Sequence, residues 1–112
     1  MVNETRRSPG TVDAEGIARL EKTARAARGL IVQSIYTAQA GHLGGPLSAV
    51  DLLTALYFGV LSVDPARPRW PDRDRFVLSK GHSSIALYTV LALRGYLPVE
   101  ELATFDAIDS RL

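Results

Sequence analysis

Hydrophobic residues between positions 17 and 38 recur at spacings of three and four, which predicts an amphipathic helix. They are Ile17, Leu20, Ala24, Ala27, Leu30, Ile31, Ile35 and Ala38. Thr11 and Asp13 are the candidate N-caps, because each side chain can accept a hydrogen bond from a free backbone N–H. Gly29 is a weak point in the interior of this helix, and it is the candidate position for a kink or break. Residues 1–10 are polar and end in Ser-Pro-Gly, which predicts a solvated tail.

A second helix is predicted over residues 48–60, which are apolar on nearly every side of a helix. The preceding residues, 39–46, form a glycine-rich loop, and Pro46 suits the first turn of a new helix. A helix that is apolar nearly all round is buried on most sides. A chain of 112 residues can hardly cover it alone, so we expect missing partner surface. Asp51 in this helix then has either a buried partner or a neighbouring chain beside it.

The apolar run from Phe76 to Leu78 predicts a short strand. The run is too short for a helix, and a glycine turn follows it, which suits a strand buried on both faces of a parallel sheet. Before it, residues 62–73 are rich in proline and charge, and Trp70 is the candidate anchor of this loop. Ligands bind beyond the carboxyl ends of the strands in open α/β sheets, so the turn after this run is a candidate site.

Two more helices complete the pattern. One runs from about Ser83 to Arg94 and ends at Gly95, and the other begins at Pro98. The pattern predicts an α/β fold, mostly helical, with one clear strand at about residues 75–79 that needs neighbouring strands. We therefore expect residues 11–112 to form one incomplete domain. The apolar face of the last helix consists of Leu102, Phe105 and Ile108.

Composition and charge exclude several classes of function. Hydrophobic residues make up 46% of the chain, so a packed core is expected rather than disorder. Thirteen Lys and Arg against twelve Asp and Glu give a formal net charge of +1, which offers no electrostatic case for nucleic acid or an acidic membrane surface. The absence of cysteine excludes disulfides and thiolate metal sites. With no signal-peptide pattern and no membrane-spanning stretch, we expect a cytoplasmic protein.

Both histidines of the chain follow a glycine in a predicted turn, at Gly41-His42 and Gly81-His82. Each could merely satisfy the backbone groups of its own turn. The occurrence of two such turns, the second after a predicted strand, favours a functional site about as strongly as a packing role. Imidazole can bind a phosphate, polarise a carbonyl or move a proton. Lys80 could attract a phosphate, although an exposed turn lysine is the commoner case.

Other kinds of site have less support. Two histidines without a third ligand do not make the usual zinc set. The sequence contains no nucleophile elbow, no dinucleotide-binding glycine motif and no P-loop. For Ser83 and Ser84, capping of the following helix is favoured over binding a ligand.

Three motifs in order resemble the start of the transketolase family. They are Gly41-His42-Leu-Gly-Gly-Pro-Leu-Ser48, Asp51-Leu-Leu-Thr-Ala-Leu-Tyr-Phe58 and Asp72-Arg-Asp-Arg-Phe-Val-Leu-Ser-Lys-Gly-His-Ser83. The resemblance covers about residues 16–112 and is strongest to the N-terminal subunit of transketolases encoded as two chains. It implies a thiamine diphosphate-binding α/β fold and active sites built between subunits.

The resemblance also implies roles for individual residues. His42 and His82 would be the catalytic residues of a reaction that moves a two-carbon ketol unit from a ketose phosphate to an aldose. Thiamine diphosphate would supply the carbanion chemistry, and the protein would orient it. The resemblance implies no metal ligand in this chain. The cofactor-binding residues implied are His82, Gly81 and Ser83, and the substrate-binding residues are His42, Ser79 and Lys80.

The sequence also departs from the family pattern. The Gly-Asp-Gly motif and later Asn that hold the diphosphate through Mg²⁺ or Ca²⁺ do not occur, nor does a third active-site histidine. Leu43 stands where many transketolases have proline, and deoxyxylulose phosphate synthases share the Gly-His-Leu-Gly stretch. We therefore expect the isolated chain to be inactive. Activity would need a C-terminal transketolase subunit or the remainder of the chain, in a homo- or hetero-oligomer. The alternatives are a non-catalytic interaction module and a related thiamine diphosphate-dependent synthase.

Overall fold

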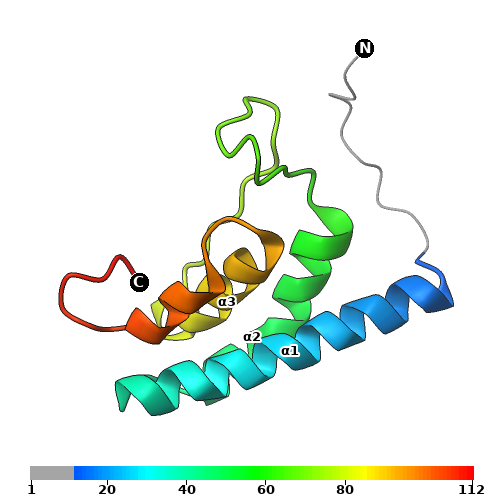
Figure 1. Cartoon of the computed structure of the whole chain (residues 1–112). Coiled ribbons are helices and arrows are strands. Elements are labelled where there is room, and N and C mark those ends of the chain that lie inside the picture. The colour runs from blue at the N-terminus through cyan, green and yellow to red at the C-terminus, as the bar shows by residue number, and fades with distance from the viewer. Residues whose placement is uncertain (1–11) are drawn as a thin grey trace.

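The computed structural model describes residues 12–112, and in these residues the chain is built from helices packed on one long helix. Figure 1 shows α2 and α3 packed against α1, with the loop between η1 and η2 projecting away from α1. The predicted tail, residues 1–10, and the candidate cap Thr11 lie outside the described residues. The elements in order are α1 (Ala14–Ala38), α2 (Gly44–Ala55), the π-helical turn η1 (Leu56–Val60), the 3₁₀ turn η2 (Gly81–Ser83), α3 (Ser84–Arg94) and the 3₁₀ helix η3 (Val99–Thr104).

Helix α1 begins at the second of its two candidate caps. The carboxylate of Asp13 accepts a hydrogen bond from the N–H of Gly16 at 2.7 Å, which satisfies one of the free donors of the first turn. The helix continues through Gly29 without a break. It ends where Gln39 adopts a left-handed conformation, with φ of 54°.

Helix α2 begins earlier than predicted, and Pro46 lies in its first turn as expected. Burial is less complete than the pattern indicated, because Leu52 is 64% exposed. Asp51 is also exposed and forms an ion pair with Arg28 of α1 at 2.5 Å, so this partner is not buried. After Ala55 the helix widens into the π-helical turn η1.

The predicted strand at residues 75–79 is wrong, and with it the predicted α/β fold. Residues 12–112 contain no strand, and residues 73–80 form an extended segment outside any sheet. A strand needs a neighbouring strand to complete its backbone hydrogen bonds, whereas here Phe76 packs its ring against Tyr57 of η1, with centroids 6.1 Å apart. Val77 is 82% exposed, so the apolar run is not buried on both faces. The described fold is therefore all helical.

The hydrophobic core lies where α1, α2 and α3 meet. Each large aliphatic side chain buried here stabilises the fold by about 1.5–3 kcal/mol relative to an exposed one. Helix α3 ends at Gly95, which has φ of 111°, as the sequence predicted. The face predicted for the last helix holds only in part, because Leu102 is buried but Ile108 is 93% exposed. The largest fully buried hydrophobic side chains are Ile31, Leu53, Ile85, Val50 and Val90.

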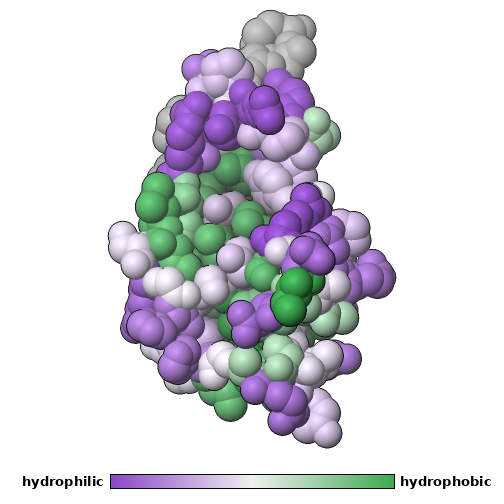
Figure 2. Space-filling view, turned by 90° about the vertical axis from the view of Figure 1, so that its left-hand side faces the viewer, coloured by the Kyte–Doolittle hydropathy of each residue, from purple (hydrophilic) through white to green (hydrophobic). Residues whose placement is uncertain are grey.

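The surface combines a hydrophilic loop with exposed hydrophobic side chains. Figure 2 shows the hydrophobic residues gathered below the hydrophilic top of the molecule. Large side chains that are more than half exposed include Tyr36, Leu52 and Val77. Of the helices in residues 12–112, none combines the length and apolar character needed to cross a membrane.

Candidate functional site

Two turns that are far apart in sequence bring the two histidines together. His42 lies just before α2, and His82 lies in η2, just before α3. The centroids of their imidazole rings are 4.8 Å apart and the ring planes are nearly perpendicular, at 84°. Contacts between α2 and η2 hold the two turns side by side, and both imidazoles are exposed.

The first turn is shaped by Gly41. Its φ of 111° lies in the left-handed region, which glycine adopts without steric cost. A Cβ atom at this position would also lie 3.3 Å from the Phe105 ring and 3.4 Å from Ile35. The chain therefore closes tightly over the end of α1 immediately before His42.

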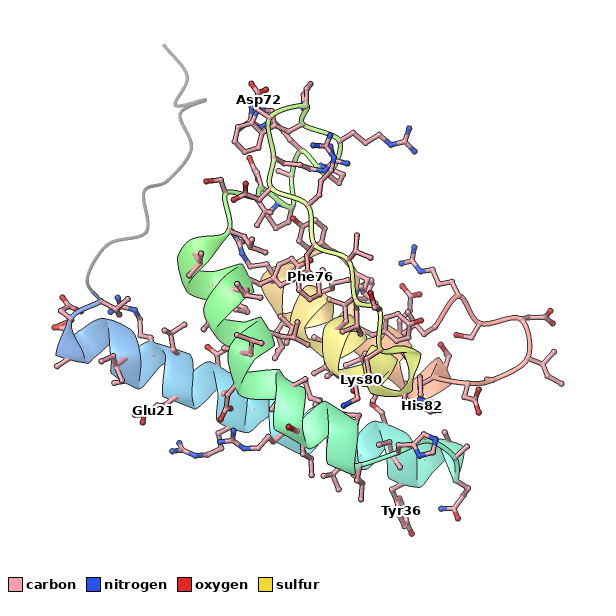
Figure 3. The ribbon with its side chains drawn as sticks, turned by 180° about the vertical axis from the view of Figure 1, so that it is seen from behind. Glu21, Tyr36, Asp72, Phe76, Lys80 and His82 are labelled. Carbon is pink, nitrogen blue, oxygen red and sulfur yellow. The ribbon has the colours of Figure 1, made fainter. Side chains whose placement is uncertain are left out.

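The second turn follows the extended segment. The N–H of Ser83 donates to the carbonyl of Lys80 at 3.0 Å, which closes the turn, and α3 starts at Ser84. Figure 3 shows Lys80 and His82 at the same end of the molecule as Tyr36, near the C-terminal end of α1. Asp72 lies at the opposite end of the segment.

A cavity of about 450 Å³ opens beside the two histidines. Five of the six site residues predicted from the sequence line it, and the sixth, Ser83, does not. Five of the residues predicted from the sequence therefore share one cavity. Their chemical roles stay predictions. The lining residues are Gly41, His42, Ser79, Lys80, Gly81, His82, Ser84, Ile85, Phe105 and Asp106.

Ser83 is placed differently from its prediction as a helix cap. It precedes α3, but its side chain makes no capping hydrogen bond there. The residue is fully buried, and its hydroxyl oxygen has no hydrogen-bond partner. An unpaired buried hydroxyl is unfavourable, so a cap does not explain the residue.

Sequence reasoning missed the wall that comes from the end of the chain. Phe105 and Asp106 follow η3 and line the cavity. The Phe105 ring packs on Tyr88 of α3, with centroids 6.3 Å apart. Asp106 has φ of 62°, and its N–H donates to the carbonyl of Leu112 at 3.2 Å. No motif marked these two residues, because their position depends on how the last segment folds back.

Three side chains at the cavity can bind an anionic group such as a phosphate, and the Asp106 carboxylate, which also lines it, adds a negative charge. Two imidazoles and the Lys80 ammonium are hydrogen-bond donors or can become donors, and the free N–H groups at the start of a helix favour negative charge. Among residues 12–112, the structure shows no group of three or more His, Asp or Glu side chains that could hold a metal ion.

A second cavity, of about 400 Å³, lies between η1, α3 and the loop that follows η1. Asp64 and Arg67 pair in this loop at 3.1 Å, and the hydrogen bond from Arg67 lowers the pKa of the Asp64 carboxyl. The Arg67 guanidinium lies 4.9 Å from the centre of the Trp70 ring, in cation–π geometry. Trp70 is only 9% exposed, so the prediction that it anchors the loop is confirmed.

Comparison with known proteins identifies the family. Residues 20–112 match the model of the transketolase, thiamine diphosphate binding domain. The chain belongs to the transketolase family. The sequence resemblance is therefore confirmed, and the part of the family that this chain matches is its thiamine diphosphate binding domain.

Several curated relatives agree with this assignment. The 6-deoxy-6-sulfo-D-fructose transketolase subunit SqwG of Clostridium sp. (strain MSTE9) is 48% identical over 87 residues, which cover 78% of this chain and 32% of the relative. An apulose-4-phosphate transketolase subunit of Phocaeicola vulgatus is 42% identical over 96 residues, which cover 86% of this chain and 34% of the relative. Transketolase 1 of Escherichia coli (strain K12) is 41% identical over 92 residues, which cover 81% of this chain and 14% of the relative. The chain described here thus spans about a third or less of the length of these relatives. Two of them are named as subunits.

Proposed function

We propose that this chain forms the histidine side of a transketolase active site. The whole protein would transfer a two-carbon ketol unit from a ketose phosphate to an aldose. The observation that carries the proposal is the His42–His82 contact, with ring centroids 4.8 Å apart beside a cavity, in a chain of the transketolase family.

The residues at the cavity fit thiamine diphosphate as a ligand. Lys80, His82 and the start of α3 offer positive charge and N–H donors to a diphosphate. When bound, the cofactor supplies the carbanion chemistry. We assign Gly81 and His82 to the cofactor side of the cavity. Ser83, also predicted there, is fully buried and does not line the cavity.

His42, Ser79 and Lys80 are assigned to the sugar phosphate. The Lys80 ammonium attracts the phosphate, and the Ser79 hydroxyl can donate or accept a hydrogen bond. Both imidazoles line the same cavity, so the unprotonated nitrogen of one can accept a proton from a sugar hydroxyl while the N–H of the other donates one. The Phe105 ring forms an apolar part of the cavity lining, beside these polar groups.

The rest of the site is proposed to come from sequence outside these 112 residues. The Gly-Asp-Gly motif that would hold the diphosphate through Mg²⁺ or Ca²⁺ does not occur here, so we assign the metal ligands to a C-terminal subunit or to the remaining chain. The exposed hydrophobic side chains, including Val77 at 82%, are the surface where that sequence would pack. We expect a cytoplasmic homo- or hetero-oligomer.

Kinetics of the complete protein test the proposal. His42→Ala is expected to slow turnover by about 10²–10⁴-fold, the usual contribution of a proton-transferring side chain. His82→Ala is expected to weaken the use of cofactor or substrate. Arg69→Ala, at an exposed loop residue, is the control and should keep wild-type kinetics. Wild-type kinetics in both histidine variants would return the histidines to a packing role. A complete protein without any ketol transfer would favour the interaction module instead.

A further inference from the structure

Gly45 and Ser83 pack against each other, and each lies within three residues of one of the two histidines. Ser83 is fully buried, and its hydroxyl oxygen has no hydrogen-bond partner. A Cβ atom built on Gly45 would lie 2.5 Å from that oxygen, which is too close for two non-bonded atoms. The same Cβ atom would lie 3.8 Å from the Ser83 Cβ, which is an ordinary contact. Glycine at position 45 and serine at position 83 therefore fit each other as a pair.

This contact joins the two turns that carry the imidazoles. Gly45 lies in the first turn of α2, three positions after His42, and Ser83 follows His82 directly. The Ser83 side chain is fully buried, so we expect a methyl group added at Gly45 to move one turn relative to the other rather than only to rotate the hydroxyl. The stem of Lys80 lies at the same place, with its Cε 3.9 Å from the added Cβ.

We propose that the Gly45–Ser83 contact sets the separation of His42 and His82. Gly45 and Ser83 are then positioning residues for the site. Ser83 acts here through its shape, since its hydroxyl makes no hydrogen bond and caps no helix. The catalytic consequence of this spacing rests on the proposed transketolase function, but the spacing itself does not.

A double-mutant cycle in the complete protein tests the proposal. Gly45→Ala should lower kcat by up to about 100-fold, the effect of a misplacement near 1 Å. In the Ser83→Ala background the same change should have little effect, because the methyl group added at position 45 takes the space that the hydroxyl left. The double variant should therefore match Ser83→Ala alone, whatever effect Ser83→Ala has by itself. Such dependence of one substitution on the other is the signature of direct contact.

Gly44→Ala is the matched control. Gly44 lies in the same turn of α2, but a Cβ atom there would meet nothing within 4 Å. Both substitutions make the same gain in helix propensity, so a difference between them reports on the contact with Ser83. Gly44→Ala should keep wild-type kinetics.

A second readout is independent of ketol transfer. The rates at which diethyl pyrocarbonate modifies His42 and His82, followed by peptide mass spectrometry of the complete protein, report on the surroundings of each imidazole. Gly45→Ala should change the ratio of the two rates by several-fold, and the double variant should restore the ratio of Ser83→Ala. If the protein proves to have no transketolase activity, this pattern still supports the spacing proposal.

The proposal fails if Gly45→Ala behaves like Gly44→Ala in the modification experiment. It also fails if the double variant remains as altered as Gly45→Ala. If Gly45→Ala alone does not fold, a double variant with the thermal transition and modification ratio of Ser83→Ala supports the proposal, and an unfolded double variant overturns it.

Discussion

Tyr57 shows how the packing of η1 changes the acidity of one side chain. It is 8% exposed, and the rings of Phe76 and Tyr96 lie against it, with centroids 6.1 and 6.5 Å away. Burial, followed by the proximity of Tyr96, raises the pKa of the Tyr57 hydroxyl above 10.0. The folded protein therefore keeps this proton to a higher pH than the unfolded chain does.

This difference predicts a change in stability at alkaline pH. A raised pKa contributes stability that is complete below the unfolded value of 10.0 and is lost as pH rises through the folded value. The free energy of unfolding should therefore fall less in Tyr57→Phe than in the wild type between about pH 9 and about pH 11. Urea titrations across this range measure it, with Tyr36→Phe as the control at a 74% exposed tyrosine. Equal slopes for Tyr57→Phe and wild type would contradict the assignment.

At the residue scale, local motifs predicted the histidines that line the cavity better than they predicted the residues packed around them. A glycine followed by a histidine in a turn is a short-range pattern, so His42 and His82 could be found from the sequence. The surroundings of Ser83 depend on Gly45, which approaches from another helix, so a helix cap was the natural but wrong interpretation. Phe105 and Asp106 reach the cavity only through the packing of the final segment.

At the element scale, Arg94 connects three parts of the chain. It lies at the end of α3, where a positive charge also suits the helix dipole. Its Nε donates to the carbonyl of Tyr57 in η1 at 2.9 Å, and its Nη2 donates to the carbonyl of Val63 at 3.3 Å. The guanidinium thus ties the π-helical turn and the loop after it to α3.

Removing this side chain should loosen the loop. Arg94→Ala is expected to lower the free energy of unfolding by about 1.5–3 kcal/mol, the range for hydrogen bonds to charged groups. Urea denaturation measures the loss, and hydrogen exchange should rise over residues 61–74. Arg25→Ala, at an exposed arginine of α1, should stay within about 0.5 kcal/mol of wild type. Equal stability of the two variants would show that Arg94 does not hold the loop.

The positions of α1 and α3 could be predicted and the strand could not, for one physical reason. A helix satisfies its backbone hydrogen bonds within itself, so periodicity, Asp13 and Gly95 were enough to locate α1 and the end of α3. A strand depends on a partner, and the run from Phe76 to Leu78 has no strand beside it in the described residues. Hydrophobic character alone therefore did not determine the conformation of that segment.

At the scale of the whole molecule, the chain is proposed to present one side of a site. It spans 32% of one subunit relative and 14% of a longer transketolase, while Leu52 and Val77 are largely exposed. The family match identifies a thiamine diphosphate binding domain, and the cavity supplies groups for only part of the proposed ligand.

The isolated 112-residue chain is therefore expected to bind no thiamine diphosphate and to be poorly soluble as a monomer. The diphosphate would lack its metal-binding motif, and the exposed apolar surface would favour association. Calorimetric titration with thiamine diphosphate and Mg²⁺ measures the first property, and light scattering the second. The complete protein is the control and should bind. Tight binding by the isolated chain would contradict the prediction.

The position of Trp70 has a consequence for spectroscopy. It is the single tryptophan of the sequence, and it is buried in the loop beneath Arg67. Asp72 of the same loop lies at the opposite end of the molecule from His82 (Figure 3). Tryptophan emission therefore reports on the opening of this loop, at a distance from the two histidines.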